Sequence, residues 1–502
     1  MMLAFTGLGI FILIGLSVWL PPLWRLRRYV ACIAILGLSV STGLVFGLHP
    51  SIWSGLVVIL GIYQLINLLR LVEGRTQAEY LYSVSLKSAL WLTLAQLGVL
   101  GAAALTHQIG IDVRGLWAIT GVVLLGLSIF LLISLRRTLR TTTPPANVES
   151  IADRDLPTLT VCIPARNESA DLEACLKNLV HSNYPKLEII VLDDCSQDKR
   201  TPEIIRDFAQ HGVRFMSGTT PPETWFAKNH AYQQLADTAN GDILLFCGVD
   251  TRFEPSTLAD MVEIMLHKKK RVVSFLPANK TPATRRLEDL MVQPGRYAWE
   301  LVPPRRWLNR PPILSTCWLI YAEDYKKAGT MKAIARSIAP ESFFAKYAVD
   351  HGDGYSFMVA PQKIGFRSAK AFVDQRATAV RTRYPQVHRR PEIVAFLSLG
   401  EFAALVLPFI ATVGALVTQQ WLLACLFGAS SLLSAYTYSK VVEVTYRRFL
   451  WRGAWLLPFA ALYDIGLLNY SMWQYEFREV IWKGRNVCIP AMRVIPQLPK
   501  LK

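Results

Sequence analysis

The chain has 502 residues, of which 52% are apolar and only 18% are charged, and its mean hydropathy is +0.29. Ordinary soluble chains carry about a quarter charged residues, so this composition excludes a disordered protein, a disulfide scaffold and a purely soluble globule. The net charge is +17, and in an apolar chain such an excess is more typical of cytoplasmic membrane flanks than of nucleic-acid binding. The eight cysteines form no CxxC pair and indicate buried thiols rather than a metal site.

Five apolar runs at the N-terminal end are long enough to cross a bilayer. They cover about 3–20, 29–47, 53–70, 88–106 and 115–135, so we predict a membrane block over residues 1–140. The first run has neither a basic segment before it nor a small-residue cleavage site, and we predict a retained span rather than a signal peptide. Basic residues follow the first, third and fifth runs, which places the N-terminus outside and residue 140 onward in the cytoplasm.

The rest of the chain alternates between soluble and apolar composition. Residues 141–158 hold three prolines and three acids and are predicted to form a linker, and 159–390 to form a water-soluble domain. Apolar runs return at about 393–416, 421–438 and 454–472, within a second membrane block over 391–475. Three crossings would put the tail, residues 476–502, outside, although it is strongly basic. We therefore expect 454–472, which contains Pro458 and Asp464, to be re-entrant or to lie along the surface.

Residues 159–260 alternate between short apolar strands and amphipathic helices. The strand candidates are 159–164, 187–192, 213–216 and 242–247, and the helix candidates are 170–181, 202–211 and 226–239. Continuous apolar strands separated by helices predict a parallel α/β sheet. Each of three strands ends in polar or acidic residues, and ligands of such sheets bind beyond these strand ends. Turn chemistry alone would also favour Asp and Asn there.

The residues after these strands are Arg166, Asn167 and Glu168, then Asp193 and Asp194, then Asp250. No glycine-rich phosphate loop follows any strand, which argues against a dinucleotide or Walker-type site. Carboxylates at strand ends suit a divalent cation that holds a diphosphate, because hard cations take oxygen ligands.

The segments LTVCIPARNES, LEIIVLDDCSQD and GDILLFCGVDTRF resemble the family-2 glycosyltransferases of GT-A fold over roughly residues 157–390. The stretch PPETWFAKNHA, residues 221–231, is similar to the "P-P-x-x-W-x-G-K-x-x-A" motif of the branch associated with hopanoids and carotenoids. The tail motif Trp482-Lys483-Gly484-Arg485 fits that branch as well. The resemblance implies an α/β GT-A domain embedded between helical membrane blocks.

The resemblance also implies roles for particular residues. Nucleotide-sugar contacts would come from Pro164, Ala165, Arg166, Asn167, Glu168, Asp193, Asp194 and Lys228. Asp250 matches the last acid of the D-x-D motif and would hold Mg²⁺ or Mn²⁺. Candidates for acceptor or diphosphate contacts are Trp225, Arg383, Trp482 and Arg485. For Lys228, Trp225 and Arg383, the alternatives are a solvated lysine, a core tryptophan and a basic flank of a membrane helix.

Two positions depart from the family pattern. The D-x-D motif begins with Gly248, so one carboxylate is missing, and the acid pair that usually contains the catalytic base is replaced by Ser337-Ile338-Ala339-Pro340-Glu341-Ser342. Glu341 is our candidate for the base, which takes the proton of the acceptor hydroxyl. The alternative for Glu341 is a first-turn acid that favours the helix dipole.

Together these features predict an inverting membrane glycosyltransferase that moves a sugar from a nucleotide donor to an isoprenoid-like lipid at the cytoplasmic membrane face. Its expected partners are the donor, the lipid acceptor and membrane lipids, with no nucleic acid. The alternatives are a processive polysaccharide synthase, although the Q-x-x-R-W motif is not evident, and a non-catalytic membrane scaffold. The sequence does not specify the sugar, the base or the lipid.

Overall fold

The computed structural model describes most of the chain and divides it into two compact units. The described residues are 2–19, 26–48, 50–73, 79–109, 113–144, 150–279, 287–303, 311–352, 354–359, 365–446, 452–488 and 493–494. The first unit comprises Met1–Leu125, Ala379–Ser430 and Asp464–Glu479, and the second comprises Gly126–Thr378, Ser431–Tyr463 and Val480–Lys502. Much of the predicted basic tail, residues 489–492 and 495–502, lies outside the described residues.

Five helices fill the N-terminal part of the chain. They are α1 (Met2–Ser17), α2 (Arg27–Leu48), α3 (Ile52–Val72), α4 (Glu79–Ile109) and α5 (Val113–Thr142). A capping box between Ser51 and Ser54 starts α3 and satisfies backbone donors at that end. Helices α2 to α5 contain segments long and apolar enough to cross a membrane, whereas the apolar part of α1, Thr6–Ser17, is shorter.

Four helices follow the soluble part of the chain. They are α15 (Pro391–Glu401), α16 (Leu407–Val417), α17 (Trp421–Tyr446) and α18 (Arg452–Phe477). A π-helical turn, Phe402–Val406, joins α15 to α16, because Pro408 has no N–H to donate to the preceding turn. Two further segments, Pro391–Val417 and Trp421–Tyr446, are also long and apolar enough to span a membrane. The described residues therefore contain six such segments. The segment 454–472 lies in the continuous helix α18, and its path relative to the membrane stays a prediction.

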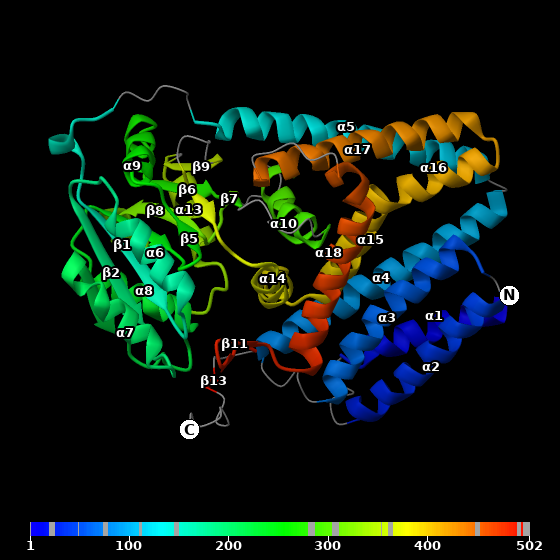
Figure 1. The fold of residues 1–502 in the computed structure, drawn as a ribbon. Coiled ribbons are helices and arrows are strands. Elements are labelled where there is room, and N and C mark those ends of the chain that lie inside the picture. The colour runs from blue at the N-terminus through cyan, green and yellow to red at the C-terminus, as the bar shows by residue number, and fades with distance from the viewer. Residues whose placement is uncertain are drawn as a thin grey trace. The chain divides into compact units, whose positions relative to one another are not determined.

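The second unit contains a seven-stranded sheet in the order β3-β2-β1-β4-β8-β6-β9 (Figure 1). The strands are β1 (Leu159–Ala165), β2 (Leu187–Asp193), β3 (Val213–Ser217), β4 (Ile243–Cys247), β6 (Val272–Leu276), β8 (Cys317–Tyr321) and β9 (Tyr355–Val359). The first four strands in the chain are parallel, which confirms the predicted α/β class. Strand β8 runs antiparallel to β4 and β6, so the sheet as a whole is mixed.

Helices cover both faces of this sheet. One face packs on α6 (Ala170–Val180), α7 (Arg200–Asp207) and α9 (Thr257–His267), and the other on α8 (Ala227–Thr238), α12 (Ala322–Lys327) and α13 (Pro340–Asp350). Because both faces are buried, β1 and β4 are apolar along nearly their whole length. Other helices are α10 (Val292–Leu301) and α14 (Phe372–Gln386). Small sheets are formed by β5 (Thr251–Arg252), β7 (Ala278–Asn279) and β10 (Arg367–Ser368), and by β11 (Ile481–Trp482), β12 (Arg485–Asn486) and β13 (Arg493–Val494).

Candidate functional site

The polar residues after β1, β2 and β4 meet at one edge of the sheet. Strand β1 lies between the other two, and its last residue, Ala165, pairs with Asp193 of β2. Because the three strands are parallel, their carboxyl ends open onto the same edge. The structure therefore brings together the acidic residues that the sequence placed after separate strands.

Arg166 holds the loops after β1 and β2 together. Its Nη1 donates to the carbonyl oxygens of Asp194 and Cys195 at 2.6 and 2.5 Å. The amide of Asn167 donates to Ser196 Oγ at 3.0 Å, and both Asn167 and Cys195 adopt left-handed backbone angles, with φ of 48° and 53°. Arg166 is buried, and its guanidinium links the two loops by hydrogen bonds instead of facing solvent.

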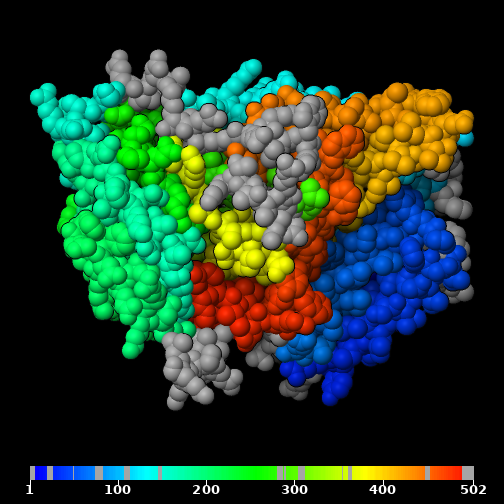
Figure 2. All heavy atoms as spheres, in the orientation of Figure 1, coloured from blue at the N-terminus to red at the C-terminus, as the bar shows by residue number. Residues whose placement is uncertain are grey.

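A C-terminal hairpin, residues 480–488, packs against the same two loops. Its turn, Lys483-Gly484, has φ of 49° and 74°, which is the left-handed pair that two-residue hairpins require. Arg485 Nη1 lies 2.5 Å from Asp194 Oδ2, and Arg166 Nε donates to the Lys483 carbonyl at 2.9 Å. Lys483 Nζ lies 2.7 Å from Glu168 Oε1. In Figure 2, red atoms near the C-terminus lie directly against the green atoms of this unit.

The contacts of the hairpin create a buried charge network. The side chains of Arg485 and Asp194 are 1% and 5% exposed, so their ion pair is almost completely shielded from water. Burial lowers the pKa of Arg166, and the nearby Arg485 lowers it further, while Asp194 opposes both. Burial raises the pKa of Glu168, and Lys483 opposes this shift. Sequence reasoning placed Arg485 and Trp482 on the acceptor or diphosphate, but it did not anticipate that Arg485 pairs with Asp194.

Asp250 projects from the turn after β4, beside Gly248. A Cβ atom built on Gly248 would lie 2.6 Å from Asp250 Oδ1, so the carboxylate occupies the space that a side chain at position 248 needs. Within the described part of the chain, no group of three or more His, Cys, Asp or Glu side chains could hold a metal ion. Asp250 alone nevertheless fits a Mg²⁺-like ion, which is commonly held by one or two carboxylates plus substrate phosphates.

Helix α8 begins beside this site and carries two basic side chains. Lys228 Nζ lies 5.2 Å from the centroid of the Tyr232 ring. His230 stacks edge-on with Trp225, with ring centroids 5.7 Å apart. Burial lowers the pKa of His230, Asp194 raises it and Arg485 lowers it, so both charged groups lie within electrostatic range of the imidazole. Sequence reasoning missed His230, whose only signal was its position two residues after Lys228.

Glu341 stands in the first turn of α13, directly after Pro340, and is 5% exposed. Burial raises the pKa of the Tyr232 phenol well above its ordinary value, and Glu341 and Asp250 are among the groups that raise it further. Both carboxylates therefore act electrostatically on Tyr232, a fully buried residue of α8.

The sequence model of the family described as "Glycosyl transferase family 2" matches residues 160–327. This segment begins in β1, ends at the last residue of α12, and includes Asp193, Asp194 and Asp250. The chain carries a family-2 glycosyltransferase domain. The predicted GT-A domain flanked by apolar helices is confirmed by this match together with the mixed sheet.

Curated relatives share this domain. The chain is 32% identical over 163 residues to the "Probable glycosyltransferase YdaM" of Bacillus subtilis, covering 29% of this chain and 38% of the relative. It is 25% identical over 194 residues to a "Beta-monoglucosyldiacylglycerol synthase" of Nostoc, covering 38% of each chain. It is 37% identical over 92 residues to a "4,4'-diaponeurosporenoate glycosyltransferase" of Staphylococcus haemolyticus, covering 18% and 24%. The chain thus spans well under half the length of these relatives.

A mannosyltransferase from Pyrobaculum calidifontis, solved with GDP-Man and Mn²⁺, is a structural neighbour. It is 17% identical, covers 71% of this chain and 99% of its own, and superposes with a TM-score of 0.44.

The remaining predicted site residues lie in different surroundings. Pro164 and Ala165 are the last residues of β1, and Trp225 packs at the edge of the core beside α8. Trp482 is half-buried in β11. Arg383 belongs to the other compact unit, where it forms an ion pair with Asp464 through both of its terminal nitrogens.

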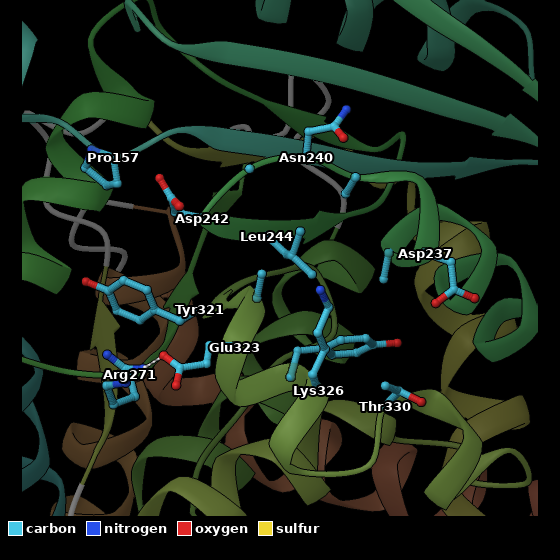
Figure 3. A pocket seen from close by; sticks show the side chains of 15 residues that line it. Pro157, Asp237, Asn240, Asp242, Leu244, Arg271, Tyr321, Glu323, Lys326 and Thr330 are labelled. Carbon is cyan, nitrogen blue, oxygen red and sulfur yellow. Dashed lines mark hydrogen bonds and ion pairs between the residues drawn. The ribbon is translucent and has the colours of Figure 1, made fainter.

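A pocket of about 530 Å³ opens at the opposite end of the glycosyltransferase sheet (Figure 3). It is lined by residues that precede β4, including Asn240 and Asp242, and by Tyr321 at the end of antiparallel β8. Arg271 pairs there with Asp324 at 2.5 Å and with Glu323 at 3.5 Å. Ligands of parallel sheets bind at the carboxyl ends of the strands, so we place the donor site at the Asp250 edge instead.

We expect Arg485→Met to destabilise the glycosyltransferase domain by about 3–5 kcal/mol, because it leaves the Asp194 carboxylate buried without its charged partner. Thermal and denaturant unfolding of the purified protein measures this loss. The double variant Asp194→Leu/Arg485→Met should recover most of the loss, since replacing both partners of a buried pair is often neutral. As a control, Lys440→Met removes a more exposed ion pair with Glu443 and should cost about 1 kcal/mol or less. Equal losses from the Arg485 and Lys440 variants would contradict the prediction.

Proposed function

We propose that this protein is an inverting membrane glycosyltransferase that transfers a sugar from a nucleotide-diphosphate donor to a lipid acceptor at the cytoplasmic face of the membrane. The observation that carries the proposal is the convergence of Asp193, Asp194 and Asp250 at the carboxyl edge of a sheet that matches the glycosyltransferase family. The lipid acceptor is supported by two relatives, one named as a beta-monoglucosyldiacylglycerol synthase and the other as a 4,4'-diaponeurosporenoate glycosyltransferase.

In this proposal the loops after β1 and β2 hold the nucleoside part of the donor. Asn167, Glu168 and Asp193 border this edge, and Arg166 with Arg485 fixes the shape of both loops through Asp194. Lys228, at the start of α8, supplies positive charge toward the diphosphate. A preorganised set of loops lowers the cost of ordering the donor, which favours binding.

Asp250 would hold the divalent cation, either Mg²⁺ or Mn²⁺. When bound there, such a cation would supply positive charge to the nucleoside diphosphate leaving group, which is worth several kcal/mol in the transition state. Asp250 would be its protein ligand, since Mg²⁺ is commonly held by one or two carboxylates together with substrate phosphates.

Glu341 would act as the general base. It takes the proton of the acceptor hydroxyl while that oxygen attacks the anomeric carbon from the side opposite the diphosphate. The bond between the anomeric carbon and the phosphate oxygen breaks, the nucleoside diphosphate departs, and the configuration inverts. A positioned base of this kind contributes about 10²–10⁴ in rate.

The proposal of a lipid acceptor is supported by the apolar helices that precede and follow the glycosyltransferase domain in the sequence. Six described segments are long and apolar enough to span a membrane. Arginines after α3 and in the last turns of α5 favour the cytoplasmic side for residue 140 onward. We retain two alternatives: a processive polysaccharide synthase, and a non-catalytic scaffold for which Gly248 is the main support.

A thermal-shift screen tests the donor site. The detergent-purified protein is heated with UDP-glucose, UDP-N-acetylglucosamine or GDP-mannose, each with and without Mn²⁺. A donor at about 100 times its Kd should stabilise the protein by about 2.7 kcal/mol, and the shift should require Mn²⁺ and disappear in Asp250→Asn. The absence of a shift with every donor would favour the scaffold.

The acceptor is tested with the donor that binds, radiolabelled, and a total bacterial lipid extract. A single labelled lipid whose mass stays constant with time is the expected result. A product whose length grows with time would favour the synthase instead.

A further inference from the structure

A row of polar side chains is buried inside the N-terminal helical unit. Each is 0–2% exposed, although the same helices carry exposed Ile59, Ile62, Leu90 and Leu94, and the neighbouring α2 carries exposed Leu36 and Val40. The row comprises Gln64, Asn67 and Arg70 on α3 and Ser85, Ser88, Thr93 and Gln96 on α4. Residues three or four apart lie on one helix face, so the row follows the facing surfaces of the two helices.

The side chains of this row lie between neighbouring helices. Asn67 Nδ2 donates to the Ser85 carbonyl at 2.9 Å, which joins α3 to the start of α4. A methyl group on Gly61 of α3 would lie 3.6 Å from Gln96 Nε2, and one on Gly15 of α1 would lie 3.5 Å from Gln64 Nε2. The amides therefore occupy the interior of the bundle rather than its lipid-facing surface.

Many polar atoms of this row make no hydrogen bond in the described structure. They include Asn67 Oδ1, the hydroxyls of Ser85 and Ser88, and both amide atoms of Gln64 and Gln96. A buried polar atom without a partner costs roughly 1–3 kcal/mol, and the interior of a membrane bundle offers little bulk water to replace the partner. So many unsatisfied atoms in one place point to a polar ligand that completes them.

The charges at one end of the row indicate the nature of that ligand. Glu476 lies between two arginines: Arg70 Nε is 2.7 Å from Oε2, and Arg389 Nη2 is 2.7 Å from Oε1. Two guanidinium groups and one carboxylate leave one net positive charge, and all three side chains are at most 10% exposed. Arg70 Nη1 and Nη2 donate no hydrogen bond within the described residues. A guanidinium with both terminal nitrogens available matches the paired oxygens of a phosphate group.

We propose that this polar row is a binding site for the phosphate head group of a membrane lipid. Arg70 pairs with the phosphate and balances the net charge, and Ser85 and Ser88 donate their hydroxyls to it. Gln64 and Gln96 extend the polar path inward and can satisfy the ester or hydroxyl groups that follow the phosphate. The exposed leucines and valines around the bundle favour a ligand that arrives from the bilayer. The site is built from residues other than those of the donor edge and does not rest on the proposed transferase activity.

Thermal unfolding of the full-length protein in dodecyl maltoside tests this site with three probes. Dioleoyl phosphatidic acid carries the phosphate on a lipid, dioleoylglycerol carries the same chains without it, and inorganic phosphate lacks the chains. We expect phosphatidic acid to raise Tm by about 2–5 °C and dioleoylglycerol to leave it unchanged. An equal shift with inorganic phosphate would support the phosphate site and identify a soluble source.

Variants distinguish this site from general binding of anionic lipid. Ser85→Ala/Ser88→Ala removes two hydroxyls with almost no change of volume and should abolish most of the shift, as should Arg70→Gln. Arg28→Gln removes an exposed arginine of α2 and should keep the full shift. If Arg70→Gln does not fold, the double serine variant decides the outcome. A shift that persists in the serine variant, or no shift with either phosphate probe, would overturn the proposal.

Discussion

Asp250→Asn is expected to lower the rate of sugar transfer by at least about 10²-fold, with little change in stability. The substitution keeps the size of the side chain but removes the charge that would hold the divalent cation, and metal stabilisation of a leaving diphosphate supplies several kcal/mol. Steady-state transfer from the donor identified by thermal shift, measured across a Mn²⁺ titration, gives the effect. We expect the variant to need more Mn²⁺ as well as to turn over more slowly.

Asp155 offers a matched control for Asp250. It lies in the short 3₁₀ turn Asp153–Asp155 before the amino end of β1, is 61% exposed and pairs with Arg154. Asp155→Asn should retain near-normal transfer and an unchanged Mn²⁺ requirement. If both Asn variants transfer sugar at the rate and with the Mn²⁺ requirement of the parent protein, Asp250 is not a metal ligand.

Glu341→Gln is expected to reduce kcat by about 10²–10⁴-fold and to leave KM for the donor nearly unchanged. The amide keeps the shape of the side chain in its buried position after Pro340 but cannot take the proton of the acceptor hydroxyl. Initial rates at several donor concentrations separate the two parameters.

Glu323→Gln is the control for Glu341, because Glu323 is a first-turn glutamate of α12 that is 65% exposed. It should leave kcat unchanged. Slow hydrolysis of the donor without acceptor should persist in Glu341→Gln if the donor site is intact. A normal kcat in Glu341→Gln would contradict the prediction and indicate that Glu341 is a first-turn acid that interacts favourably with the helix dipole.

The parallel half of the sheet could be predicted from the sequence because its strands carry an unambiguous local signal. LTVCIPA and LEIIVLD are apolar along nearly their whole length, and both strands are buried on both faces. The antiparallel strand β8 was not predicted, since CWLIY carries no sign of its direction, which is set by pairing with β4 and β6. Helix α7 ends at Asp207, earlier than the periodicity predicted, and a short 3₁₀ turn follows at Ala209–His211.

The acidic residues of the candidate site could be predicted from the sequence, but the basic residues that pair with them could not. Asp193, Asp194 and Asp250 follow strands, so their meeting at one edge follows from parallel pairing. The contact between Asp194 and Arg485 joins residues 291 positions apart, and no local pattern encodes such a pairing. The buried row on α3 and α4 was missed for a different reason: single serines and amides in an apolar run barely lower its hydropathy.

The hairpin turn at Lys483-Gly484 has a consequence for biosynthesis. The ribosome synthesises β1 and β2 long before it synthesises Arg485. The ion pair between Asp194 and Arg485, which stabilises the loops after these strands, can therefore form only when nearly the whole chain has been made. The nascent protein should therefore be unable to hold a donor until its later helices have been synthesised. For the same reason, a soluble fragment that ends at residue 390 would lack this partner, and we expect it to be isolated only as an unstable species.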